Sequence, residues 1–224
     1  MLYQFQKNRK ATSKEIFENI YANQMWGKGI DTEDTFYSGH GSHRSTLVSM
    51  YIPAVENFIK EFDQKLDVVD LGCGDFAVGS QVRKNFNSYI ACDVVEPLIE
   101  RNKDIYKDLN VDFRVLDIVT QELPCGDVAI IRQVFQHLSN KQITKVIPKL
   151  IEKYKYIIVT EHLPASNKFK ANMDLMEGPD IRLGFDSGIV LTKPPFNLKI
   201  RKEDILCEIL DEVGIIRTIA YTVS

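Results

Sequence analysis

The chain has 224 residues, of which 44% are apolar and 26% are charged, with 28 Lys and Arg against 31 Asp and Glu. This length predicts a single domain that buries about 70% of its unfolded surface, so neither a metal nor a disulfide is needed for folding. The net charge of -3 argues against a dedicated nucleic-acid binder, whose surface is basic. No run approaches the roughly 18 apolar residues of a membrane span, and residues 1–10 lack the apolar core of a signal peptide.

The four cysteines are far apart in the sequence, at Cys73, Cys92, Cys125 and Cys207. They form no CxxC pair and no Cys/His cluster with the ligand spacing of a zinc site. Reduced, buried thiols in a cytoplasmic protein are the simplest interpretation. We therefore expect a cytoplasmic protein without a metal site.

The first 65 residues are expected to form a helical cap ahead of the main fold. A helix is predicted over 12–25, because Thr12 and Glu15 have the spacing of a capping box and apolar residues follow at intervals of three to four. A second helix is predicted over 46–62, with Pro53 bending it or starting a new first turn. Between them lies a polar, glycine-bearing segment.

From residue 66 onward, short apolar runs alternate with helical segments. Strands are predicted over 66–71, 89–95, 111–116, 127–131 and 156–160, and helices over 78–86, 97–109 and 140–153. This alternation predicts a doubly wound, mostly parallel α/β sheet, with the core at 66–162. The segment 163–203 is rich in Pro and Gly and is too long for a bare connector, so it is predicted to be a substrate-side insert. Two strand-like runs in 204–224 predict an antiparallel terminal hairpin.

A glycine turn follows the first core strand, in the stretch Asp70-Leu71-Gly72-Cys73-Gly74. Two glycines separated by one residue allow a sharp turn and the close approach of a ligand to the main chain. A dinucleotide would place its pyrophosphate here, and the Asp70 carboxylate would repel it. A cationic amino-acid ligand, with an ammonium and a sulfonium, would be attracted instead. An NAD-dependent dehydrogenase is the second choice on fold alone.

Two further acids follow the next two predicted strands. Asp93 closes the second strand, about 20 residues after the glycine turn, where an acid accepts hydrogen bonds from ribose hydroxyls. Asp117 follows the third strand and is placed to accept from an adenine amino group. Val94 and Ile118, the neighbours of these acids, are expected to line the same site.

These motifs resemble those of class I S-adenosylmethionine (SAM)-dependent methyltransferases. The stretch 70–74 resembles the first motif of that superfamily, Asp93 the second and Asp117 the third, with Phe76 where many members have a third glycine. The resemblance covers about 66–162, and the terminal hairpin fits strands six and seven. It implies a seven-stranded Rossmann-like fold, SAM as cofactor, S-adenosylhomocysteine (SAH) as product and no metal. Four flanking segments also resemble a bacterial subgroup of small-molecule methyltransferases associated with surface glycans, at 26–27, 38–42, 132–138 and 178–182.

Methyl transfer from a sulfonium is an in-line displacement, and a base is needed only when the acceptor carries a proton of high pKa. The turn Asn/Asp-Pro-Pro-aromatic, typical of enzymes that methylate bases of nucleic acids, is absent after the fourth strand. Two histidines are candidate bases: His137, beyond strand four, and His162, after strand five. Glu161 precedes His162 and is expected either to orient it or merely to end the strand.

The remaining candidates surround the expected cofactor and acceptor. Arg132 and Gln133 are expected near the methionine part of the cofactor, and Tyr37 or Arg44, in a lid over the cofactor, to meet its carboxylate. The alternative interpretation of this segment is a polar surface loop. On the acceptor side the candidates are Trp26, His40, Asp180 and Arg182. Trp26 either caps the acceptor or packs the first helix, and Arg182 either binds an anionic group bidentately or forms an exposed ion pair.

The sequence thus predicts an enzyme that methylates a small polar, anionic metabolite, on oxygen. A sugar or a phosphorylated glycan precursor is the preferred acceptor, on the subgroup resemblance alone. The alternatives are N-methylation of a small molecule or a protein, and a cofactor-binding partner subunit without activity. We expect a monomer or homodimer that binds neither nucleic acid nor membrane.

Overall fold

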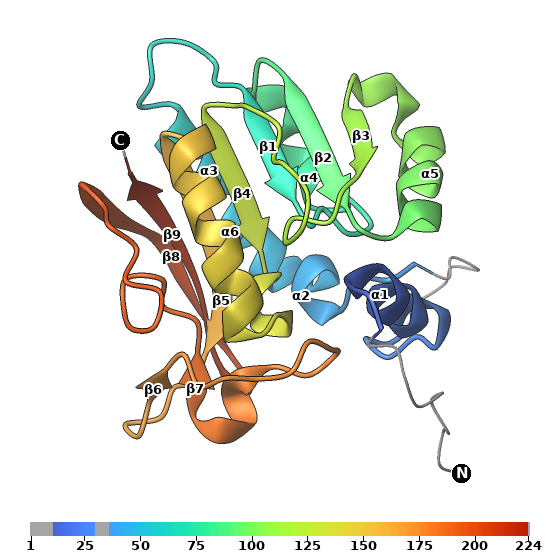
Figure 1. Cartoon of the computed structure of the whole chain (residues 1–224). Coiled ribbons are helices and arrows are strands. Elements are labelled where there is room, and N and C mark those ends of the chain that lie inside the picture. Colours follow the sequence, from blue (N-terminus) through green and yellow to red (C-terminus); the bar gives the residue numbers. More distant parts are fainter. Residues whose placement is uncertain (1–10, 30–35, 224) are drawn as a thin grey trace.

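The computed structural model describes residues 11–29 and 36–223 (Figure 1). The interpretation of residues 1–10 lies outside the described residues, as does the 30–35 part of the predicted lid. Among the described residues, no helix is long and apolar enough to span a membrane.

Seven strands form one sheet in the order β3-β2-β1-β4-β5-β9-β8 (Figure 1). Their bounds are β1 Val68–Leu71, β2 Tyr89–Asp93, β3 Asp112–Val115, β4 Val128–Arg132, β5 Tyr156–Leu163, β8 Lys202–Asp211 and β9 Gly214–Thr222. Strands β1 to β5 run parallel to one another, whereas β9 runs antiparallel to both β5 and β8. The predicted mostly parallel α/β sheet with an antiparallel terminal hairpin is therefore confirmed.

Helices cover both faces of the sheet. On one face α6 (Asn140–Lys153) packs against the apolar side chains of β4 and β5; on the other face lie α3 (Ser45–Ile59), α4 (Gly79–Val82) and α5 (Glu96–Ile105). Residues that alternate along each strand go to opposite cores, as Val128 and Ala129 do. This two-sided burial explains why β1 and β4 are apolar at nearly every position.

Two helices begin where the sequence provides a complete cap. Thr12 caps α1 (Ser13–Ala22), and its side chain accepts from the Glu15 backbone while the Glu15 carboxylate accepts from the Thr12 backbone. Ser139 and Gln142 repeat the same arrangement at the start of α6. The bounds of α6 match the prediction residue for residue, because cap and amphipathic pattern agree there.

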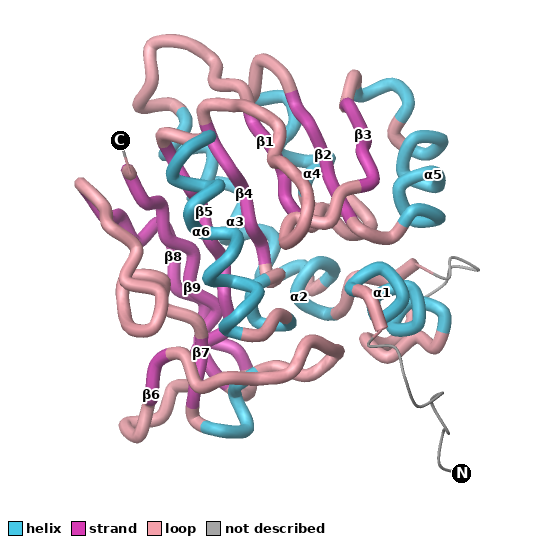
Figure 2. Tube along the Cα trace, in the orientation of Figure 1, coloured by secondary structure: helices cyan, strands magenta, loops and turns pink. Residues whose placement is uncertain are grey.

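The helix predicted over 78–86 and the strand predicted over 156–160 differ from the prediction in ways that affect the site. The helix predicted over 78–86 is only the single turn α4, followed by a 3-10 turn at Arg83–Asn85. Strand β5 continues three residues past its predicted end, since Glu161, His162 and Leu163 pair with β9. The insert therefore begins after Leu163; Figure 2 shows it as largely loop, with the short strands β6 (Lys170–Ala171) and β7 (Ser187–Gly188) paired in parallel.

Candidate active site

A cavity of about 420 Å³ opens at the carboxyl ends of the parallel strands, between the sheet, the N-terminal segment and the insert. This is where ligands bind in open α/β sheets. The sequence-predicted residues that line it are Trp26, His40, Asp70, Gly72, Cys73, Gly74, Asp93, Val94, Asp117, Ile118, Arg132, Gln133, His137, His162 and Asp180. Four others do not line it: Tyr37, Arg44, Glu161 and Arg182.

The glycine turn has the left-handed backbone that only glycine adopts without strain. Gly72 has φ 82° and Gly74 has φ 55°. A Cβ on Gly72 would lie 2.5 Å from Val134 Cγ2, and one on Gly74 would lie 2.4 Å from Ser38 Oγ. Both glycines are therefore required: Gly72 leaves room for Val134 in the turn after β4, and Gly74 leaves room for Ser38 in the N-terminal segment.

Phe76, at the position where many methyltransferases have a third glycine, also has a left-handed backbone, with φ 61°. Its side chain is fully buried and makes edge-to-face contacts with Tyr89, Tyr106 and Phe113 at centroid distances of 5.0 to 5.4 Å. Such a backbone costs about 1–3 kcal/mol in a non-glycine residue. Aromatic contacts contribute about 0.5–1.5 kcal/mol each, so the cluster offsets this cost.

Two of the three predicted acids are held by polar contacts at the cavity wall. Asp93 accepts from the backbone N–H groups of Gly74 and Val95, both at 3.1 Å. Burial raises the pKa of Asp93 to about 6, although these hydrogen bonds act to lower it. Asp70 accepts from the Tyr89 hydroxyl at 2.9 Å, and burial raises its pKa to about 7. A cationic ligand beside them would favour their ionised forms.

The third acid, Asp117, caps the loop after β3. Its carboxylate accepts from the Val119 backbone N–H at 2.8 Å and from the Thr120 hydroxyl at 2.7 Å. These contacts fix the loop that carries Ile118 into the cavity.

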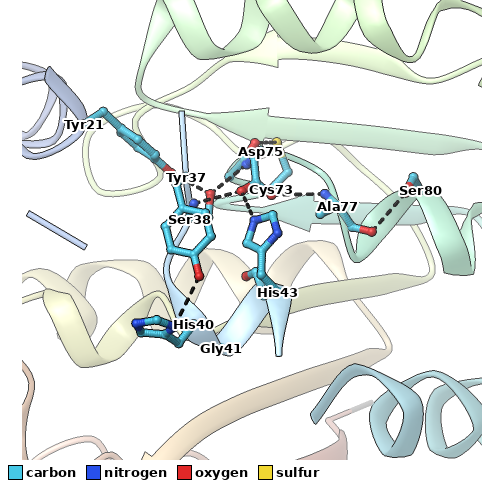
Figure 3. A network of polar contacts seen from close by, with 12 residues as sticks. Tyr21, Tyr37, Ser38, His40, Gly41, His43, Cys73, Asp75, Ala77 and Ser80 are labelled. Carbon is cyan, nitrogen blue, oxygen red and sulfur yellow. Dashed lines mark hydrogen bonds and ion pairs between the residues drawn. The ribbon is translucent and has the colours of Figure 1, made fainter. Parts of the chain in front are cut away.

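A polar network ties the N-terminal segment to the glycine turn, and its centre is Asp75, which the sequence interpretation missed (Figure 3). The Asp75 carboxylate accepts from the Ser38 and Ala77 backbone N–H groups, and it pairs with His43 Nε2 at 2.6 Å. Ser38 Oγ in turn accepts from the Asp75 backbone N–H at 2.8 Å. Burial acts to raise the pKa of Asp75, but these partners hold it below its ordinary value. The segment is thereby fastened over the cavity as a lid.

Arg132 is the only Lys or Arg among the described residues that line the cavity. Its guanidinium donates to Ser42 Oγ at 3.1 Å and to the Gly41 carbonyl, and it lies 5.1 Å from the centre of the Tyr51 ring. It therefore joins the sheet to the lid helix α2 (His40–His43). It is also the cavity's one cation suited to an anionic ligand group.

The two lid residues expected at the methionine carboxylate lie elsewhere. The Arg44 guanidinium pairs with Asp211 and Glu212 in the turn between β8 and β9. Tyr37 stacks on His43 at 4.5 Å and contacts His40 Nδ1 through its hydroxyl. These expectations are corrected: both side chains have partners in the lid or the hairpin, outside the cavity lining.

The acceptor side is closed by a contact between the N-terminal segment and the insert. Trp26 Nε1 donates to the Pro179 carbonyl at 3.2 Å, and the Trp26 ring lies 4.9 Å from that of His137. Trp26 also packs against Tyr21 on α1, at 5.3 Å. It therefore packs the first helix, as one of the two expectations had it, and it also lines the cavity, whereas its role toward an acceptor stays a prediction.

Glu161 does not orient His162, because neighbouring residues of a strand project to opposite faces. His162 lines the cavity, whereas Glu161 lies among Val159, Leu163 and Tyr221 on the other face of the sheet. There its carboxylate accepts from the Phe135 backbone N–H at 3.2 Å. Burial raises the pKa of Glu161 to about 8, despite the nearby Arg182 charge.

Arg182 is neither an anion receptor in the cavity nor an exposed ion pair, which corrects both expectations. It is 1% exposed, and its guanidinium donates to the carbonyls of Phe135, Gln136, Leu138 and Met173 and to Asn140 Oδ1. Three of those carbonyls belong to the turn that carries His137. Arg182 therefore fastens the insert to this turn from behind.

Four more residues near the cavity were not named as candidates from the sequence. Ser38, Tyr51 and Gln136 line it, and Asp211 lies behind His162. Ser38 and Gln136 fall within the segments 38–42 and 132–138 and Asp75 directly follows the glycine motif, whereas Tyr51 and Asp211 had no signal in the sequence. Among the described residues, no group of three or more His, Cys, Asp or Glu side chains is arranged to hold a metal ion.

No protein-family model matches the chain, and no curated protein matches it. Solved structures do. N-methyltransferase NodS from Bradyrhizobium japonicum WM9, in complex with SAH, has a TM-score of 0.64 at 10% identity, over 94% of this chain and 97% of that chain. Magnesium protoporphyrin IX methyltransferase from Synechocystis PCC 6803, with bound SAM, has a TM-score of 0.60 at 13% identity, over 97% and 100%.

A SAM-dependent methyltransferase from Leishmania major has a TM-score of 0.65 at 16% identity, over 95% of this chain and 87% of that chain. The chain thus has the Rossmann-like fold of SAM-dependent methyltransferases. At these identities the likeness concerns the fold alone, so activity must be argued from the site.

Proposed function

We propose that this protein is a SAM-dependent methyltransferase. The observation that carries the proposal is the convergence of the glycine turn and the acids Asp70, Asp93 and Asp117 on one cavity at the carboxyl ends of the strands. A cavity of about 420 Å³ is within the usual range for small ligands. The similar folds crystallised with SAM or SAH support the same ligand here.

The residues present fit this cofactor from end to end. Asp93 suits the ribose hydroxyls, and Ile118 suits a face of the adenine ring, with the Asp117 carboxylate near its amino group. The ammonium group is attracted by Asp70, and the carboxylate by Arg132, whose buried Nε has no partner among the described residues. When bound, SAM supplies a methyl group activated by the positive sulfur.

On the acceptor side, the chain supplies neutral imidazoles and a wall that excludes water. His137 and His162 both line the cavity, and burial lowers the pKa of each, that of His137 to about 4. A neutral imidazole accepts the proton of a hydroxyl group, which supports O-methylation. We propose a small polar acceptor such as a sugar. The anionic group expected from Arg182 has lost its basis, because that side chain is buried behind the turn of His137 and does not line the cavity.

Calorimetry tests the cofactor assignment directly. Wild-type protein is expected to bind SAH and not NAD. Asp93→Ala should weaken SAH binding by about 10- to 100-fold, because two hydrogen bonds to a carboxylate are lost at about 1.5 kcal/mol or more apiece, offset in part by solvent.

Asp112→Ala is the matched control, since Asp112 is an exposed acid at the opposite end of the neighbouring strand, paired with Arg114. Its affinity for SAH should equal that of the wild type. Binding of NAD by the wild type, or unchanged SAH affinity in a folded Asp93→Ala protein, would contradict the assignment.

A further inference from the structure

Resting on the proposed function, we propose that His162 is the general base of the methyl transfer, that Asp211 is its positioning residue, and that His137 acts as a hydrogen-bond donor. The sequence leaves the choice between the two histidines open. The surroundings of their ring nitrogens separate them.

His162 faces a carboxylate contributed by the terminal hairpin. Its Nε2 lies 3.7 Å from Asp211 Oδ2 and is buried, with no hydrogen-bond partner among the described residues. At this distance a small rotation of either side chain forms the bond, and catalytic hydrogen bonds are often long before ligands bind. With Nε2 turned toward Asp211, Nδ1 is the nitrogen left for an acceptor.

The hairpin is shaped to admit this ring. Gly214, the first residue of β9, lies opposite Asp211 in the hairpin. A Cβ on Gly214 would lie 3.1 Å from His162 Nε2 and 2.3 Å from the Leu163 carbonyl oxygen. Any larger residue would displace the imidazole from its place beside the carboxylate.

Asp211 is itself held from the other side. Its Oδ1 pairs with the Arg44 guanidinium, which also contacts Glu212, so Oδ2 is the oxygen that faces His162. Arg44 directly follows the lid helix α2. The same arginine thus connects the lid to the carboxylate behind the base.

The charged surroundings favour a neutral His162 in the resting protein. Burial lowers its pKa, and Asp211 partly opposes this effect. Glu161 lies on the opposite face of the sheet, Arg44 and Glu212 act through Asp211, and Arg132 lines the same cavity. Neutral imidazole is the form that a general base needs, and Asp211 then stabilises the imidazolium that forms.

In His137 the proton lies on the other ring nitrogen, and the side-chain amide of Gln136 determines this. Gln136 Oε1 accepts from the His162 backbone N–H at 3.4 Å, so its amide nitrogen is the atom that lies 3.2 Å from His137 Nε2. An amide N–H donates, so His137 Nε2 accepts and the ring proton is on Nδ1. That Nδ1 is buried, and the backbone of Gly178 and Asp180 in the insert favours a proton on the ring, which opposes the lowering of the pKa of His137 by burial. The only lone pair of His137 is already engaged by Gln136, so His137 can act as a donor but not as the base.

The roles give a balanced reaction. The acceptor oxygen bonds to the methyl carbon while the carbon–sulfur bond breaks, and that electron pair stays on sulfur, which becomes neutral. The hydroxyl proton passes to His162 Nδ1 and leaves to solvent after the products separate. The products are a methyl ether, SAH and one proton.

The tautomers of the neutral histidines test the proposal in the unmodified protein. The chain has four histidines, so long-range proton–nitrogen NMR spectra of the SAH complex, assigned with single His→Gln variants, resolve each ring. We expect the proton of His162 on Nε2 and that of His137 on Nδ1. The reverse pattern would overturn the proposal.

The variant Asp211→Asn tests the positioning role. It should lower the pKa of His162 in an NMR titration, because the stabilising carboxylate is lost, while the control Asp112→Asn leaves that pKa unchanged. An unchanged His162 pKa in Asp211→Asn would refute the role of Asp211. If this variant does not fold, the tautomers in the wild type decide. Calorimetry with SAH on the same samples separates failure of this proposal from failure of the cofactor assignment.

Discussion

The buried Arg182 allows a sharp prediction about stability. In Arg182→Met the apolar volume is nearly kept, but five acceptors lose the donor that the guanidinium supplies. A buried polar group without a partner costs about 1–3 kcal/mol. The Phe135 carbonyl keeps a second donor, the Leu138 backbone N–H, and both Asn140 and Met173 are partly accessible to solvent. The carbonyls of Gln136 and Leu138 therefore carry most of the loss.

Two such groups give about 2–6 kcal/mol, and relaxation of the insert reduces the upper end. We therefore expect a loss of about 4 kcal/mol in the free energy of unfolding. Because single domains have about 5–15 kcal/mol in total, the variant should be close to unfolding at 37 °C.

Urea denaturation followed by circular dichroism measures this loss, with the slope checked for two-state behaviour. Arg114→Met is the matched control, because Arg114 is exposed and pairs with Asp112 on the same strand. Its effect should remain within about 0.5 kcal/mol. A loss below about 1 kcal/mol in Arg182→Met would refute the argument that Arg182 supports the turn of His137.

Two further predictions concern the lid and the buried acid. Gly74→Ala should weaken SAH binding by tenfold or more in calorimetry, because its Cβ would lie 2.4 Å from Ser38 Oγ and displace the lid; unchanged affinity would contradict this. Burial raises the pKa of Glu161 from 4.5 to about 8, so the folded protein favours the neutral acid, and that contribution to stability is lost as pH rises from about 4.5 through about 8. Glu161→Gln should therefore gain stability relative to the wild type across this window in urea titrations, and a constant difference would disprove the shift.

Local patterns were sufficient for the fold and for bringing the glycine turn and its neighbouring acids to one cavity. Each core strand is an apolar run bounded by turn residues, and each proposed cofactor-binding acid closes or follows a strand, so topology alone brings Asp93 and Asp117 to one edge. Helix α6 has both a capping box and an amphipathic face, and its bounds were predicted without error. Such features depend only on residues close in sequence.

The remaining features depend on contacts between distant segments. Arg182 is an arginine in a loop rich in Pro and Gly, which is typical of a surface anion receptor. Only the path of the insert places it behind the turn of His137. The approach of Asp211 to His162 depends on the antiparallel register of β5 and β9, which no local pattern fixes. Glu161 and His162 were treated as a pair because β5 was predicted to end at residue 160. Its continuation through Leu163 sends them to opposite faces.

The position of Trp26 has a practical consequence. It is the only tryptophan of the chain, and it joins the N-terminal segment to the Pro179 carbonyl beside the His137 ring. Indole fluorescence responds to the polarity around the ring and is quenched by a protonated imidazole in contact with it. The protein therefore contains a natural optical reporter at the junction of its two cavity walls. Stopped-flow emission is expected to follow ligand binding in the cavity and ionisation of His137 in real time, without any attached label.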